Sequence, residues 1–303
     1  MAENKEIKLN TNPTPVQERY RCQTSAPLLE FLMEKSCRNR TSAKKIIASG
    51  RISINNVPTT RATDEVPTDA VVTIHTGIPP QPLNHPKLEV LWEDKDYVIL
   101  YKKSGLPTVN TAHKSRQETA LSIMSQHYKK GEEGAKVFMV NRLDKSTAGF
   151  ICFAKNIKAK ERIVKEWHQR VKHQIFVACV EGELTRETEE LTATSAQDEE
   201  STTARTITAK IKIDKSSAHG GMHIVQADVL RARIFSLRKL FGDNRLSIFG
   251  DVRSRSAFQT DKMIGLEQIV LEIQLPNEAK TRRFERPYPT HYFSWLKEDK
   301  GDN

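Results

Sequence analysis

Short apolar runs, separated by turn-forming residues, follow one another along most of this chain. The first 24 residues are polar, and a proline-rich stretch at 77–87 interrupts the pattern again. Two groups of elements remain, one within 25–76 and one within 88–298. We therefore predict a flexible N-terminal segment, a small domain, a semi-rigid linker and a large domain.

The first group combines helical and strand-like spacing. Apolar spacing predicts a helix within 26–32 and a second over 43–49, with Thr41 or Ser42 as its N-cap. The pair at 55–56 is a hairpin turn signal between two short apolar runs. This part of the chain is therefore expected to be a small α/β domain.

The second group is richer in strands. Residues 118–128 and 157–170 have helical spacing, whereas 186–205 are acidic and rich in Ser and Thr, which predicts an exposed loop. Strands are expected at 88–93, 97–101, 150–154, 174–180, 207–213, 222–230, 234–237 and 268–273. The whole chain is thus predicted to be α+β.

One polar stretch leads directly into a buried-looking strand. In NRLDKSTAG, Asp144 would lie in a loop at the strand entrance, between Arg142 and Lys145. Neighbouring cations favour the ionised form of a carboxylate, and an ionised aspartate suits nucleophilic attack. The alternative from this stretch alone is a solvated aspartate that pairs with a neighbouring base.

The composition narrows the class of protein. With 37% hydrophobic and 28% charged residues it is globular, and no apolar run approaches the roughly 20 residues that span a bilayer. The formal net charge of +10 favours a polyanionic partner, most simply nucleic acid. The N-terminus has no apolar signal region. We expect a cytoplasmic monomer, with import into an organelle left open.

Cysteine and histidine spacing shows no ligand pattern. The four cysteines are widely spaced, two of them lie in apolar runs, and the nine histidines form no HExxH-like pair. We expect reduced thiols and no metal.

Basic residues cluster around the second predicted helix, whose N-terminus also offers backbone N–H groups to a phosphate. They are Arg38, Arg40, Lys44, Lys45 and Arg51. A solvated helix face is the alternative. The surrounding RTSAKK, IIASG and ISINN motifs resemble the RNA-binding module named after small-subunit ribosomal protein S-four, which implies that these five bases bind RNA.

Five stretches after residue 88 carry a second resemblance. They are LYKKSGLPTV, NRLDKSTAGFICFAKN, QIFVACVEGEL, SLRKLFGDNRLSIFGD and LPNEAKTRRFERPYPTHYFSWL. In this order they resemble the motifs of the RluA-type pseudouridine synthases, which isomerise uridines in ribosomal or transfer RNA. The resemblance implies a mixed, mainly antiparallel sheet and no cofactor. It puts Asp144 at the position of the family's sole catalytic aspartate.

The resemblance also implies roles for other residues. Arg238 would be the ion-pair partner of Asp144, with a surface salt bridge as the alternative. Phe176 stands where the family usually has tyrosine and would stack on the target base, unless it is a plain core residue. Asn141 replaces the family's histidine in the pocket. Arg142 could occupy the space of a flipped base or bind a phosphate, and Arg233 would contact RNA.

The departures at Phe176 and Asn141 keep a second hypothesis open. It is a catalytically impaired RNA-binding or ribosome-assembly protein that retains the synthase fold. A hydrolase with an aspartyl nucleophile is a third, although the sequence offers neither the metal site nor the phosphate loop that most such enzymes need.

Overall fold

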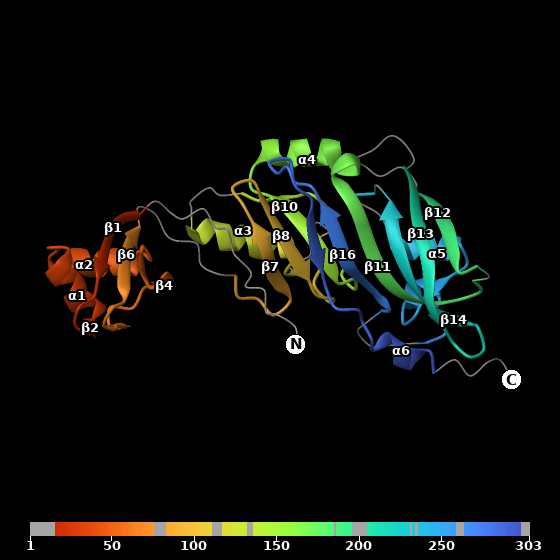
Figure 1. The fold of residues 1–303 in the computed structure, drawn as a ribbon, viewed down its shortest axis with the longest axis horizontal. Helices are drawn as coiled ribbons and strands as arrows, with labels where there is room; N and C mark the ends of the chain where they lie inside the picture. The colour runs from red at the N-terminus through yellow and green to blue at the C-terminus, as the bar shows by residue number, and fades with distance from the viewer. Residues whose placement is uncertain are drawn as a thin grey trace. The chain divides into compact units, whose positions relative to one another are not determined.

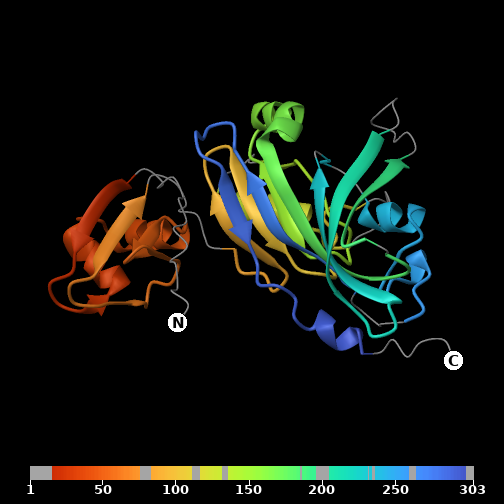
Figure 2. The ribbon, with the colours of Figure 1, turned by 45° about the vertical axis from the view of Figure 1, so that its right-hand side comes forward.

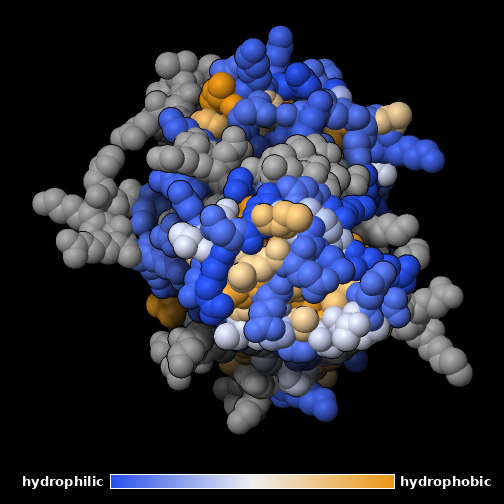
Figure 3. Space-filling view, turned by 90° about the vertical axis from the view of Figure 1, so that its left-hand side faces the viewer, coloured by the Kyte–Doolittle hydropathy of each residue, from blue (hydrophilic) through white to orange (hydrophobic). Residues whose placement is uncertain are grey.

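The computed structural model describes residues 16–75, 83–110, 117–131, 136–184, 186–195, 205–230, 232–233, 236–258 and 264–297 (Figure 1). The described residues fall into two compact units. One is built on residues 16–75, with which 123–131 and 136–137 group, and the other on the remaining residues from 84 onward. The face seen in Figure 3 is mostly hydrophilic, with a small apolar strip.

The N-terminal unit packs two helices against a small antiparallel sheet. Its elements are β1 (Val16–Arg21), β2 (Ala26–Pro27), α1 (Leu28–Lys35), α2 (Arg40–Ala48), β3 (Ile52–Ile54), β4 (Val57–Thr59), β5 (Glu65–Val66) and β6 (Val71–His75). The sheet order is β1-β6-β3-β4, and β2 pairs with β5. Leu28, Leu32, Ile47, Ile52 and Ile74 form the centre of the core, each at most 1% exposed. The two predicted helices and the hairpin are thus confirmed.

Two local predictions for this unit are wrong. The N-cap of α2 is Asn39, whose side chain accepts a hydrogen bond from the Ser42 N–H at 2.8 Å, and not Thr41 or Ser42. The prediction of a flexible segment over residues 1–24 is wrong for residues 16–21. These residues form β1, which pairs antiparallel with β6, and its Tyr20 packs on the core. Residues 1–15 lie outside the described part of the chain.

Two antiparallel sheets form the larger unit in the described part of the chain, together with three α-helices and the start of a fourth, whose residues 123–131 group with the N-terminal unit. The elements of the larger unit are β7 (Leu88–Glu93), β8 (Tyr97–Lys102), α3 (Ala120–Gly131), β9 (Phe138–Met139), β10 (Gly149–Ala154), α4 (Ile157–Arg170), β11 (Val171–Glu181), β12 (Thr188–Ser195), β13 (Arg205–Ser216), β14 (Met222–Leu230), α5 (Leu237–Asp243), β15 (Ser247–Ile248), the 3-10 turn η1 (Val252–Ser254), β16 (Leu266–Ile273), β17 (Arg282–Glu285) and α6 (Tyr292–Trp295). The sheet orders are β7-β8-β10-β9 and β12-β13-β14-β11-β16-β17, with β15 paired to β11. The α+β class with mainly antiparallel sheets is confirmed.

The two sheets meet at β10 and β16, which Figures 1 and 2 show as neighbours beneath α4. The Gln268 N–H donates to the Ala148 carbonyl at 2.9 Å, and the Phe150 N–H donates to the Gln268 side chain at 3.1 Å. Gly149 allows this approach, since an added Cβ would lie 2.5 Å from that of Gln268. The loop before β10 is therefore placed where the sheets join.

The acidic stretch over residues 186–205, which was predicted to be an exposed loop, contains a strand. Residues 188–195 form β12, which pairs with β13 over its whole length, so the predicted loop over 186–205 is wrong there. Leu191 and Ala193 are buried and alternate with exposed or half-buried polar residues, a period-two pattern that the acidic composition concealed. Residues 196–204 lie outside the described residues.

The strand predicted over 234–237 is not observed either. Leu237 begins α5, with the Ser236 hydroxyl as the N-cap. Residues 234 and 235 are not among those described. No helix in the described ranges is long and apolar enough to cross a bilayer.

Candidate active site

Asp144 is exposed on the loop that leads from β9 into β10. The loop backbone is bound to the chain that follows β8. The Thr108 hydroxyl donates to the Leu143 carbonyl at 2.8 Å, and the Gly105 N–H donates to the Lys145 carbonyl at 2.7 Å. Ser104 donates to Ser146 O at 2.8 Å. The Asp144 carboxylate is thus accessible while its backbone is held.

Lys102, at the end of β8, is buried beneath this loop. Its ammonium donates to the carbonyls of Thr147 at 2.6 Å, Asp144 at 3.1 Å and Lys103 at 3.3 Å. Burial lowers the pKa of Lys102 to about 7, and the negative charge of Asp144 opposes part of that decrease. Lys102 was not predicted to belong to the site, because two adjacent lysines at the end of a strand are typical of a solvated strand end.

Arg238, in the first turn of α5, does not pair with Asp144. Its Nε lies 2.8 Å from Asp251 Oδ2, and its Nη2 donates to the Ser146 hydroxyl at 2.6 Å. Among the described residues no ion pair joins Arg238 to Asp144, so that prediction is wrong. Asp251 is 3% exposed and needs a cation to be buried as an anion, whereas the exposed Asp144 is solvated.

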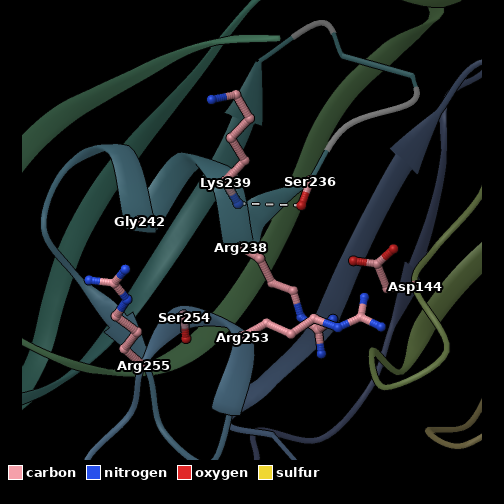
Figure 4. Close-up of a pocket in the computed structure, with 8 residues that line it drawn as sticks. All are labelled: Asp144, Ser236, Arg238, Lys239, Gly242, Arg253, Ser254 and Arg255. Atoms are coloured by element: carbon pink, nitrogen blue, oxygen red, sulfur yellow. Dashed lines mark hydrogen bonds between the residues drawn. The ribbon is translucent and has the colours of Figure 1, made fainter. Parts of the chain in front are cut away.

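Asp144 and Arg238 nevertheless line one pocket of about 550 Å³ (Figure 4). Its other lining residues are Ser236, Lys239, Gly242, Arg253, Ser254 and Arg255. Figure 4 shows the side chains of Arg238 and Arg253 extending toward Asp144, whereas Lys239 and Arg255 point away from it. The pocket combines one exposed carboxylate with four basic side chains.

Three other predicted pocket residues do not line this pocket. Phe176 is 1% exposed within the core of the larger sheet. Asn141 is 2% exposed, its side chain donates to the Phe150 carbonyl at 3.2 Å, and its oxygen accepts from the Cys152 N–H at 2.7 Å. Arg142 is exposed on the Asp144 loop. Asn141 therefore anchors β10, and only Arg142 of the three is on the surface.

Two of the predicted RNA-binding arginines are used inside the protein. Arg233 Nη1 donates to the Val140 carbonyl at 2.5 Å, next to the Asp144 loop. Arg38 forms a two-point ion pair with Glu18 at 2.7 and 2.9 Å, which holds the Glu18 pKa at about 2. Arg51 is half-buried, with its Nε 3.3 Å from the Ser49 hydroxyl. Arg40, Lys44 and Lys45 remain as the exposed bases of α2.

Sequence comparisons identify the family of this chain. Residues 96–246 match the family described as RNA pseudouridylate synthase. The ribosomal large subunit pseudouridine synthase D of Buchnera aphidicola is 28% identical over 141 residues, which is 45% of each chain. The dual-specificity RNA pseudouridine synthase RluA of Vibrio vulnificus is 29% identical over 103 residues, 34% of this chain and 39% of that protein. The chain spans about half the length of most of the curated relatives it matches.

A solved structure shares the fold. The human RNA pseudouridylate synthase domain containing 4 superposes with a TM-score of 0.51 at 15% identity, over 68% of this chain and 91% of that one. The matched stretch includes the Asp144 loop, β10, β11 and α5. The chain belongs to the RNA pseudouridylate synthase family and is of the RluA type.

Proposed function

We propose that this protein is an RNA pseudouridine synthase that isomerises specific uridines in ribosomal or transfer RNA, with Asp144 as its nucleophile. The observation that carries the proposal is the pocket itself. An exposed aspartate, on a loop whose backbone is held by hydrogen bonds, lines one pocket with four basic side chains, two of which extend toward it. The chain also belongs to this family. Such a pocket attracts a polyanion and presents a carboxylate to it.

The reaction breaks the bond between C1′ of the ribose and N1 of uracil, and joins C1′ to C5. C5 loses its proton, and N1 gains one, so no net oxidation occurs and no cofactor is required. An ionised carboxylate at the nucleotide is the reactive group that the step needs. Asp144 remains available for this role because Arg238 is occupied by Asp251.

The target base must leave its stack to reach Asp144, which costs a few kcal/mol. We assign to Arg142 the role of filling the vacated space or binding a phosphate, because it is exposed two residues before Asp144. Phe176 belongs to the hydrophobic cluster on which Leu143 packs. It supports the loop from below in place of offering an open stacking face.

The N-terminal unit is proposed to bind RNA as an S-four-like module. Support comes from Arg40, Lys44 and Lys45, which are exposed on α2 and carry the charge that attracts phosphates. Arg38 would act indirectly, because its pair with Glu18 joins β1 to the loop before α2.

Tritium release tests the activity. Cellular RNA labelled with [5-³H]uridine is incubated with the wild-type protein, with Asp144→Asn and with Glu161→Gln, an exposed carboxylate on α4. We expect release by the wild type and Glu161→Gln and none by Asp144→Asn. Because Asp144 is exposed, its variant should keep its unfolding free energy within about 0.5 kcal/mol.

Absence of release from every RNA pool by the wild type would overturn the proposal and favour an RNA-binding protein that retains the fold. Release that survives in Asp144→Asn would instead keep the activity but remove Asp144 from the nucleophile's role.

A further inference from the structure

The pocket beside Asp144 contains basic side chains that have no acidic partner among the described residues, and they come from the short turn at η1. Arg238 is neutralised by Asp251, and Lys239 forms an ion pair with Asp243 at 2.7 Å. Arg253 and Arg255 line the same pocket, and in the described part of the chain neither takes part in an ion pair. The uncompensated cations of this pocket are therefore the two arginines at η1.

The backbone of this turn is held without help from either guanidinium. Asp251 Oδ1 accepts from the Arg253 N–H at 3.2 Å, and the Ser254 hydroxyl accepts from the Ile248 N–H at 3.1 Å. The Arg255 N–H donates to the Val252 carbonyl at 3.2 Å, and Arg255 adopts a left-handed φ of 62°. Both arginine side chains are exposed on a turn whose shape is fixed by other groups.

Asp251 also fixes where the turn lies relative to Asp144. One carboxylate oxygen caps η1, and the other pairs with Arg238, which in turn donates to Ser146 on the Asp144 loop. The result is a continuous chain of contacts from the turn to the nucleophile. Figure 4 shows Arg253 directed toward Asp144 and Arg255 directed away from it. The two guanidiniums thus face different parts of one pocket.

We infer that Arg253 and Arg255 form an RNA-phosphate subsite that holds the backbone on the two sides of the target uridine. The inference rests on the proposed function for the identity of the target nucleotide. Guanidinium groups bind phosphate oxygens in a two-point geometry, and exposed, unpaired ones need no internal contact broken first. Gripping both flanking phosphates would hold the backbone while the base is drawn out of its stack.

The alternative is that both arginines are solvated surface residues. The salt dependence of binding separates the two, because each phosphate that is neutralised on a single strand contributes about 0.7 to the slope of log K against log salt concentration. The probe is a fluorescein-labelled single-stranded oligouridylate of about 12 nucleotides. Its affinity is measured by anisotropy at several salt concentrations.

The test variant is Arg253→Gln with Arg255→Asn, since asparagine tolerates a left-handed φ better than alanine. Arg253→Lys with Arg255→Lys keeps the charge. Lys158→Gln with Lys165→Gln removes the same charge from exposed positions on α4. A second measurement, tritium release from labelled cellular RNA, gives KM and kcat for each protein.

We expect the test variant to lose about 1.4 from the salt slope, while the lysine variant and the α4 variant keep the wild-type slope. KM should rise several-fold in the test variant, with kcat less affected. An unchanged slope, or an equal loss in the α4 variant, would overturn the subsite. A wild type that releases no tritium would contradict the synthase proposal alone, because the slope is measured independently of turnover.

Discussion

The N-terminal unit and the pocket of the larger unit are both basic, but their charges are used differently. On α2 the bases Arg40, Lys44 and Lys45 are exposed. Around Asp144, by contrast, Lys102 and Arg238 are held by contacts inside the protein. Lys102 is buried and bonded to three carbonyls, and Arg238 is paired with the buried Asp251. A net charge of +10 therefore includes exposed cations, which we propose attract RNA, and cations whose partners lie inside the protein.

Each unit also contains an arginine whose ion-pair partner was not predicted from the sequence. Arg38 pairs with Glu18, whose side chain is 26% exposed, whereas Arg238 pairs with Asp251, which is 3% exposed. The cost of losing the arginine depends on how well water can replace it at the carboxylate. The deeper pair should therefore matter far more to stability.

The largest effect is expected at Arg238. Arg238→Met would leave Asp251 buried without a partner and lower the free energy of unfolding by about 3–5 kcal/mol. Arg38→Met should cost about 1 kcal/mol, because Glu18 can be solvated. Urea unfolding measures both.

The double variant Arg238→Met with Asp251→Asn is the control, since asparagine can still cap η1 and carries no charge. It should recover most of the loss. Equal losses in Arg238→Met and Arg38→Met would contradict the contrast between the two units.

The next effect is a pH dependence at Lys102. Its pKa is about 7 in the folded protein and near 10.5 when exposed in the unfolded chain. Between these values the unfolded chain binds more protons, so the Lys102 contribution to the unfolding free energy increases as pH rises through this window. Below pH 7 both states are protonated and the contribution is constant.

Lys102→Met removes that contribution. Urea unfolding at pH 6.5, 8 and 9.5 should show the wild type gaining stability relative to the variant as pH rises. The control is Lys103→Met at the exposed neighbouring residue, whose unfolding free energy should change with pH as that of the wild type does. If the unfolding free energies of Lys102→Met and of the wild type changed equally with pH, Lys102 would titrate like an exposed lysine and the prediction would be wrong.

The smallest effect concerns affinity at α2. Lys44→Gln with Lys45→Gln should weaken RNA binding and reduce the salt slope by about 0.7–0.9 per charge, with little change in stability. Arg38→Gln is the matched control and should leave the slope unchanged, because its guanidinium is held by Glu18. A loss of slope in Arg38→Gln would mean that the ion pair opens to bind RNA.

Local pattern was sufficient for much of the fold. The helical spacing of α1, α2 and α4, the turn at Asn55 and Asn56, and the apolar run of β10 each depend on neighbours within a few residues. Asp144 could be placed at a strand entrance for the same reason. Strands β1 and β12 escaped prediction because polar residues dominate them, and their pairing partners decide their conformation.

The sequence alone determined the class of fold, the family resemblance and the position of Asp144 before β10, because these follow from periodicity and motif order along the chain. Only the tertiary structure decided which acid Arg238 pairs with, that Lys102 is buried beneath the Asp144 loop, and that Arg253 and Arg255 share its pocket. Ion pairing and burial depend on residues far apart in sequence, and water competes for every charge that the fold leaves exposed.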